Sequence, residues 1–171
     1  MIELEKTYLA KFLPKDLFAV KKKELIDIYI PLSALHPKLR IRKKGDKYEI
    51  TKKTKLSEND SSRQLEETIP LTGEEFEALS VAPGKKLRKI RYEYPYGGKI
   101  AEIDVFQDDL EGLVLIDFEF GTIQEKNDFQ IPDFCLVEVT QEEFIAGGML
   151  CGKKYRDIQE DLEKFEYQKL L

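Results

Sequence analysis

Alternation of apolar and polar residues is the dominant pattern along this chain. In segments rich in Ile, Val, Leu, Tyr and Phe, a polar residue occupies every second position. A period of two is typical of half-buried β-strands. The pattern predicts strands at residues 2–9, 24–31, 38–43, 47–53, 64–70, 87–94, 100–106, 113–120 and 134–140.

Short connections between these segments predict antiparallel pairing. The tripeptides Lys44-Gly45-Asp46 and Tyr96-Gly97-Gly98 carry hairpin-turn residues, and residues 108–112 link a third pair of strands. The polar stretch 54–63 is predicted to be a flexible loop. About eight antiparallel strands favour a closed barrel, because closure removes exposed sheet edges.

The helices are expected to be few and amphipathic. They are predicted at residues 14–23, 72–81, 141–150 and 154–171. Thr72 and Glu75 have the spacing of a capping box at the start of the second helix. In the C-terminal helix, Ile158, Leu162 and Phe165 share one face. The chain is therefore predicted to be an α+β protein.

Composition sets limits on the class of protein. The 171 residues are 42% hydrophobic, which is enough for a core, so we expect one domain over residues 1–171. No run of 18 apolar residues and no apolar N-terminal segment occurs, so we predict a cytoplasmic protein with no membrane partner. The net charge of −5 argues against nucleic-acid binding. Two cysteines and one histidine leave little material for a disulfide framework or a zinc site.

The polar face of the strands carries pairs of like charges two residues apart. The acidic pairs are Glu3/Glu5, Glu102/Asp104 and Asp117/Glu119, and the basic pairs are Arg40/Arg42 and Lys89/Arg91. Like charges on one face repel each other, so a ligand of opposite charge would explain them. Paired carboxylates suit Mg²⁺ or Mn²⁺, and paired Arg and Lys side chains suit phosphate oxygens.

Periodicity alone leaves two arrangements of this charged face open. The charges can lie on the solvated outside of the sheet, which is the usual place for a polar strand face. Alternatively, they can line a wet lumen while the helices cover an apolar exterior.

The order of the charged segments resembles one family. The opening Glu3-Leu4-Glu5-Lys6 is similar to the Glu-x-Glu-x-Lys strand of the CYTH superfamily, also called triphosphate tunnel metalloenzymes. This family includes inorganic triphosphatases, thiamine triphosphatases and class IV adenylyl cyclases. The resemblance covers roughly residues 2–155 and continues through the segments Arg40–Arg42, Tyr48–Lys53, Glu66–Pro70, Lys89–Arg91, Glu102–Phe106, Asp117–Glu119 and Glu138–Thr140.

The resemblance implies an eight-stranded tunnel with its charges inside and its helices outside. Its basic residues would bind the phosphates of a triphosphate-containing small molecule, and its acidic residues would hold Mg²⁺ or Mn²⁺. The phosphate-binding residues implied are Arg40, Arg42, Lys53, Lys89 and Arg91. The metal-binding residues implied are Glu3, Glu5, Glu66, Glu102, Asp104, Asp117, Glu119 and Glu138. Glu5, Lys89 and Arg91 are implied as catalytic.

Two positions depart from the family pattern. Thr7 occupies the place of the first-motif lysine, and Thr68 replaces the second acid of the fourth motif. Lys6 is adjacent, but a period of two directs it to the other face. The expected function is metal-dependent triphosphate hydrolysis by a monomer or homodimer. The alternatives are an adenylyl cyclase that makes cyclic AMP from ATP, and a non-catalytic binder of polyphosphate or nucleotide.

Overall fold

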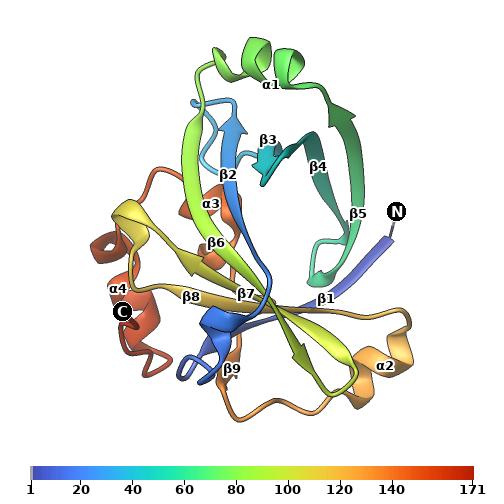
Figure 1. Ribbon diagram of the computed structural model, residues 1–171, viewed down its shortest axis with the longest axis vertical. Coiled ribbons are helices and arrows are strands. Elements are labelled where there is room, and N and C mark those ends of the chain that lie inside the picture. The colour runs from blue at the N-terminus through green and yellow to red at the C-terminus, as the bar shows by residue number, and fades with distance from the viewer. Residues whose placement is uncertain (1) are drawn as a thin grey trace.

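One nine-stranded antiparallel sheet closes on itself to form a barrel, and the helices lie outside it (Figure 1). The structure is a computed structural model that describes residues 2–171. The strands are β1 (Ile2–Ala10), β2 (Lys22–Ile30), β3 (Leu39–Lys44), β4 (Lys47–Ser57), β5 (Asp60–Leu71), β6 (Lys85–Tyr96), β7 (Lys99–Phe106), β8 (Val114–Glu119) and β9 (Cys135–Glu138). Their order is β5-β4-β3-β2-β6-β7-β8-β1-β9, with β5 also paired to β1. Strands β1 to β8 close the barrel, and the short β9 adds to β1. The prediction of an eight-stranded closed barrel in an α+β protein is therefore confirmed.

Strand β1 closes the barrel by pairing with three neighbours. Residues Glu5–Leu9 pair with β8, while residues Ile2–Leu4 pair with β5 on the other side. Residues Tyr8–Ala10 pair with β9 on the same edge of β1 as β5. The backbone groups of β1 are thereby satisfied along both edges over much of the strand, which leaves little open edge.

The alternation places apolar residues of β1, β7 and β8 on the outside of the barrel. Tyr8, Ile103 and Phe118 belong to one buried cluster there. Phe129, which follows α2 (Ile123–Asp128), covers this cluster with its ring 4.5 Å from that of Phe118. The outer face of these strands is therefore apolar and is covered by the segment around Phe129, while the polar residues lie on the inner face.

A second apolar cluster fills one end of the lumen. Leu9, Leu87, Phe106 and Leu115 each lie two residues from a polar lumen position, and they pack with Leu150, Ile158 and Leu162. Those partners come from α3 (Gly147–Leu150) and α4 (Tyr155–Glu163). The interior is thus apolar at this end and charged further along.

The helix α1 (Gly73–Ser80) begins at the predicted capping box. The Thr72 hydroxyl accepts from the amide of Glu75 at 3.2 Å, and the Glu75 carboxylate accepts from the amide of Thr72 at 2.7 Å. Phe76 packs on Tyr48 of β4 with 5.1 Å between the rings, which seats the helix on one end of the barrel (Figure 1). No helix within residues 2–171 has both the length and the apolar character needed to cross a membrane.

Two predictions of local structure in the first half of the chain were wrong. The segment 14–23 forms only a 3-10 turn at Leu17–Ala19, because β2 starts at Lys22, where it pairs with Tyr92 of β6. The segment 54–63 is a hairpin rather than a loop, since β4 continues to Ser57 and β5 starts at Asp60. Pairing between strands outweighs the polar composition of that segment.

The second half of the chain corrects two further expectations and contains one helix that was not expected. Residues 141–150 form a 3-10 turn at Glu143–Ile145 and then α3, separated by the extended backbone of Ala146. Helix α4 ends at Glu163, because the chain beyond it turns so that the Tyr167 hydroxyl donates to the carbonyl of Gly112 at 2.8 Å. Helix α2 was not predicted, since its six residues are too few to show a helical period.

Candidate active site

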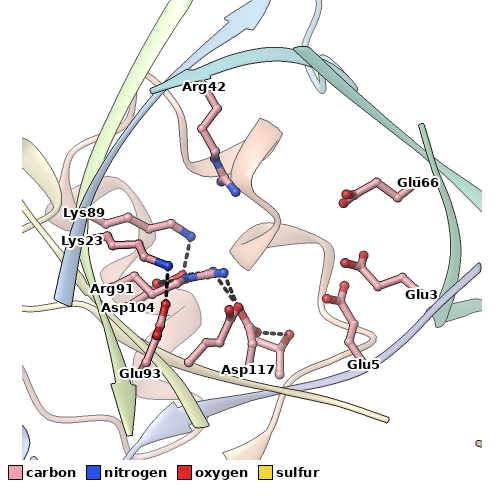
Figure 2. A network of polar contacts seen from close by, with 12 residues as sticks. Glu3, Glu5, Lys23, Arg42, Glu66, Lys89, Arg91, Glu93, Asp104 and Asp117 are labelled. Carbon is pink, nitrogen blue, oxygen red and sulfur yellow. Dashed lines mark hydrogen bonds and ion pairs between the residues drawn. The ribbon is translucent and has the colours of Figure 1, made fainter. Parts of the chain in front are cut away.

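A cavity of about 650 Å³ lies inside the barrel and carries most of the charged residues singled out by the sequence. Its lining includes the predicted residues Glu3, Glu5, Arg40, Arg42, Lys53, Glu66, Lys89, Arg91, Glu102, Asp104, Asp117 and Glu119. Figure 2 shows Glu3, Glu5 and Glu66 on one side of the interior, with the basic side chains of Arg42, Lys89 and Arg91 on the other. The charged face therefore points inward, which decides between the two arrangements left open by periodicity.

Strand register explains how residues far apart in sequence meet around this cavity. Residues directly opposite one another on paired strands share a face of the sheet. The facing pairs are Glu5 with Glu119, Thr7 with Asp117, Glu102 with Asp117, Arg91 with Asp104, Asp27 with Arg42, Arg40 with Thr51, Lys53 with Glu66, and Glu3 with Gln64. These pairs form a ring of polar side chains around the lumen.

The acidic wall is crowded enough to shift the protonation of its members. Burial raises the pKa of Glu5 to about 7; Lys53 opposes the rise, and the nearby carboxylates of Asp117, Glu3 and Glu119 add to it. Burial likewise raises the pKa of Glu119, with further repulsion from neighbouring carboxylates. A wall of this kind is short of positive charge.

Lys53 supplies part of that missing charge. Its ammonium group contacts the carboxylate of Glu3 and lies 3.6 Å from Glu5 and 3.5 Å from Glu66. Burial lowers the pKa of Lys53, but the carboxylates of Glu5 and Glu3 outweigh it and raise the pKa above its ordinary value. Lys53 is therefore a fully charged cation set among three carboxylates.

The opposite wall is organised around Arg91 and Asp104. The Arg91 guanidinium donates to both oxygens of Asp104 at 2.7 Å, contacts Glu102 and lies 3.5 Å from Asp117. Lys89 also donates to Asp104. Burial raises the pKa of Asp104, but Arg91 and Lys89 outweigh it and hold that pKa well below its usual range. Burial lowers the pKa of Lys89, and the guanidinium of Arg91 lowers it further.

Two further residues complete this wall, and the sequence analysis did not identify them. Asp27 is 1% exposed and accepts from Arg42 Nε at 2.6 Å and from Arg42 Nη2 at 2.7 Å. Burial raises the pKa of Asp27, but Arg42 outweighs it and lowers the pKa to about 2. The hydroxyl of Tyr29 accepts from Arg40 at 3.2 Å. The available signal was a single Asp in the apolar run Leu25–Ile30, on the face that meets Arg42.

Thr7 lies in the cavity lining at the position where the family pattern has lysine. Its hydroxyl donates to the Asp117 carboxylate at 2.7 Å. Lys6 points to the other face, as expected, and its ammonium group lies 3.4 Å from the Glu138 carboxylate. Glu138 is the one predicted metal ligand that does not line this cavity.

The donor set bears on whether these residues fit a metal ion. Among residues 2–171, no group of three or more His, Cys, Asp or Glu side chains is already arranged around an ion position. The chemistry nevertheless fits a hard divalent cation, because the available donors are carboxylate oxygens, and burial together with the repulsion of neighbouring carboxylates raises the pKa of Glu5. Coordination would require Glu3 and Glu5 to exchange Lys53 for the metal.

Comparison with known proteins was made by sequence first. Residues 3–131 match the model of the CYTH domain. The chain is 32% identical over 145 residues to a protein of Nitrosomonas europaea named inorganic triphosphatase. That match covers 83% of this chain and 91% of the relative, so it is not limited to one motif.

Solved structures show the same architecture. A crystal structure of an inorganic triphosphatase superposes with a TM-score of 0.63 at 26% identity, covering 87% of this chain and 93% of that one. A conserved hypothetical protein from Pyrococcus furiosus gives a TM-score of 0.52 at 19% identity, over 98% of this chain and 92% of that one. The second likeness concerns the fold alone.

Proposed function

Because the chain belongs to the CYTH domain family, we propose that it hydrolyses a triphosphate inside the barrel with the help of Mg²⁺ or Mn²⁺. The observation that carries the proposal is the cavity of about 650 Å³, in which a basic wall faces an acidic one. A triphosphate needs cations along its oxygens, and a divalent metal needs carboxylates. The same enclosed space offers both.

The basic wall supports the phosphate-binding part of the proposal. Arg40 Nε is buried and has no hydrogen-bond partner within the described part of the chain. A buried donor without a partner is costly, and a phosphate oxygen would satisfy it. Arg40, Arg42, Lys53, Lys89 and Arg91 together would neutralise the substrate's charge.

The acidic wall supports the metal-binding part. Glu3, Glu5, Glu66 and Glu119 on this wall, together with Glu102, Asp104 and Asp117 beside Arg91, would share the coordination. A bound divalent metal supplies charge neutralisation at phosphate oxygens and lowers the pKa of attacking water. Glu138 is omitted from this set, because it lies outside the cavity lining.

The protein's own residues would position the substrate for in-line attack. Lys89 and Arg91 approach from β6, so the charge that grows on the leaving phosphate would find two buried cations. Glu5 comes from the opposite wall, where its carboxylate would help to hold the metal that activates the attacking water. Thr7 contributes only a hydroxyl where the family pattern has an ammonium group.

The decisive measurement is orthophosphate release from tripolyphosphate with Mg²⁺ or Mn²⁺, repeated in excess EDTA. We expect metal-dependent release from the native protein and its near loss in Lys89→Gln. Arg88→Gln is a matched control, since Arg88 neighbours Lys89 on β6 but pairs outside the cavity with Asp108 and Glu24. Formation of cyclic AMP from ATP, or tight binding of tripolyphosphate without turnover, would contradict the proposal.

We also propose that the C-terminal segment belongs to the same working unit as the barrel, as a monomer or homodimer. Tyr167 Oη donates to the carbonyl of Gly112, and the amide of Leu170 donates to the same carbonyl at 3.0 Å. These contacts tie residues beyond α4 to the connection that precedes β8.

A further inference from the structure

Positive charge without a carboxylate partner gathers at one rim of the cavity. Lys38 and Lys55 line the same cavity as Arg40 while both remain exposed. Within residues 2–171, neither ammonium group has a carboxylate within ion-pairing distance: Lys38 contacts the ring of His36 instead. Arg40 donates to the hydroxyl of Tyr29. The deeper cations differ, because Lys53 and Arg91 are each surrounded by carboxylates.

Lys38 is held at this rim by a short relay of hydrogen bonds. Glu143 Oε1 lies 2.8 Å from His36 Nδ1, and the Lys38 ammonium lies 2.9 Å from His36 Nε2. Burial lowers the pKa of His36, which favours the neutral ring. A neutral ring can donate through Nδ1 to Glu143 and accept through Nε2 from Lys38. The relay therefore fixes the position of Lys38; Glu143 favours the charged form of Lys38, but burial and Lys55 outweigh it and lower the pKa of Lys38.

Lys55 lies near enough to Lys38 for the two positive charges to repel each other. Burial lowers the pKa of Lys38, and repulsion from Lys55 lowers it further. Two like charges at one opening repel each other, and an anion bound between them would remove that cost. Ser61 also lines this cavity, and a serine hydroxyl can donate to a phosphate oxygen.

The column of basic residues that begins just before β3 and continues along it is longer than a triphosphate requires. Lys38, Arg40, Arg42 and Lys44 all line the cavity at alternate positions. Six residues of extended chain span about 20 Å. Three phosphates in line cover only part of that length, so cations remain beyond both ends of a triphosphate centred on Arg40 and Arg42.

We propose that Lys38 and Lys55 form an additional phosphate subsite that selects linear inorganic polyphosphates of four or more phosphates. The inference rests on the proposed function for its inner subsites and extends the substrate class of that same site. A nucleoside at this rim would leave both ammonium groups without a counter-charge. A further phosphate would pair with them, and its charge-assisted hydrogen bonds would be among the stronger kinds.

The test compares tetrapolyphosphate with tripolyphosphate in the native protein and in a Lys38→Gln/Lys55→Gln variant at one ionic strength. We expect the double variant to raise KM for tetrapolyphosphate about tenfold and KM for tripolyphosphate less than about twofold, the larger change matching one or two lost charged hydrogen bonds. Lys43→Gln is the matched control, because Lys43 neighbours Arg42 on β3 but does not line the cavity. Equal losses on both substrates, or no loss on either, overturn the subsite.

Binding without turnover separates this proposal from the proposed function. Calorimetric titration of the native protein and the double variant with tetrapolyphosphate needs no hydrolysis. If no polyphosphate is turned over but the variant binds tetrapolyphosphate about tenfold more weakly than the native protein does, the subsite stands and the hydrolase proposal fails. If turnover is normal but the variant binds tetrapolyphosphate as the native protein does, the subsite alone fails.

Discussion

Arg42 reaches the cavity as one half of a buried pair with Asp27, and this pair fixes where its remaining donors point. Both Asp27 oxygens accept hydrogen bonds, from Nε and Nη2. Nη1 of Arg42 takes no part in the pair. Because the guanidinium is planar, the pair also fixes the direction in which Nη1 points. Asp27 is therefore a positioning residue for an arginine that we propose to bind phosphate.

Replacing Asp27 with Asn tests this role. The amide keeps the shape but removes the charge, so we expect the unfolding free energy to fall by about 3 kcal/mol, the lower end for breaking a buried pair. We also expect KM for tripolyphosphate to rise about tenfold. Steady-state kinetics with thermal unfolding provides the measurement. Asp108→Asn, which weakens the exposed pair with Arg88, should change neither quantity much, and an unchanged KM in Asp27→Asn would contradict the role.

Glu5 makes a separate prediction about pH. Its pKa rises from 4.5 to about 7 on folding, so the stability contributed by its protonated form is full below about pH 4.5. That contribution is lost as the pH rises through about 7. Glu5→Gln should therefore stabilise the metal-free protein at pH 8 by up to about 3 kcal/mol and change little at pH 4.5, while activity falls.

Thermal unfolding in EDTA at the two pH values measures the effect. Glu67→Gln on the exposed part of β5 is the control and should show no difference between them. A Glu5→Gln protein no more stable than the native one at pH 8 would mean that the carboxylates of this wall are not crowded.

Most of the site residues were predictable because they come in pairs at alternate positions. A doublet such as Glu3/Glu5 fixes both the face and the sign of the charge, whichever strand it meets. Asp27 was missed because it stands alone among apolar residues. Only the register with β3 shows that it faces Arg42. Glu138 was included because of the family pattern. In the structure it pairs with Tyr8, whose side chain lies on the outer side of β1.

At the level of elements, predictions failed where distant pairing decides the local structure. The segment 54–63 has the composition of a loop, yet its residues continue β4 and β5 almost to the turn. The neighbouring part of β5 also pairs with β1, which lies more than fifty residues away in sequence. Helix α1 was predicted well because its capping box is local.

The close approach of α3 to β2 makes a prediction at this scale. A Cβ atom at Gly147 would overlap the hydroxyl of Tyr29, the partner of Arg40. Gly147→Ala should therefore lower the unfolding free energy by about 1–3 kcal/mol and weaken tripolyphosphate binding. Gly73→Ala is the control, since a Cβ there would meet only the Tyr48 ring at an ordinary 3.6 Å. Thermal unfolding and calorimetry measure the two effects, and unchanged binding in Gly147→Ala would separate Tyr29 from the site.

The whole barrel should respond to divalent ions before any substrate is present. A ligand that binds only the folded state raises its stability, and the carboxylate wall exists only when β1, β5, β7 and β8 are assembled. We expect Mg²⁺ or Mn²⁺ to raise Tm at pH 8, with KCl at equal ionic strength as the control. The shift should shrink in Glu5→Gln. Equal Tm values in metal and KCl would argue against the metal-binding wall.

The place of Lys53 among Glu3, Glu5 and Glu66 has a consequence for the order of events. This ammonium neutralises part of the charge that a metal would otherwise balance. If a divalent ion took its place among these carboxylates, the ammonium of Lys53 would be free to donate hydrogen bonds to a polyanion. Cation and anion should therefore strengthen each other's binding by the same factor, as reciprocity demands. Lys53 would then leave the three carboxylates only when the metal and the polyphosphate bind together.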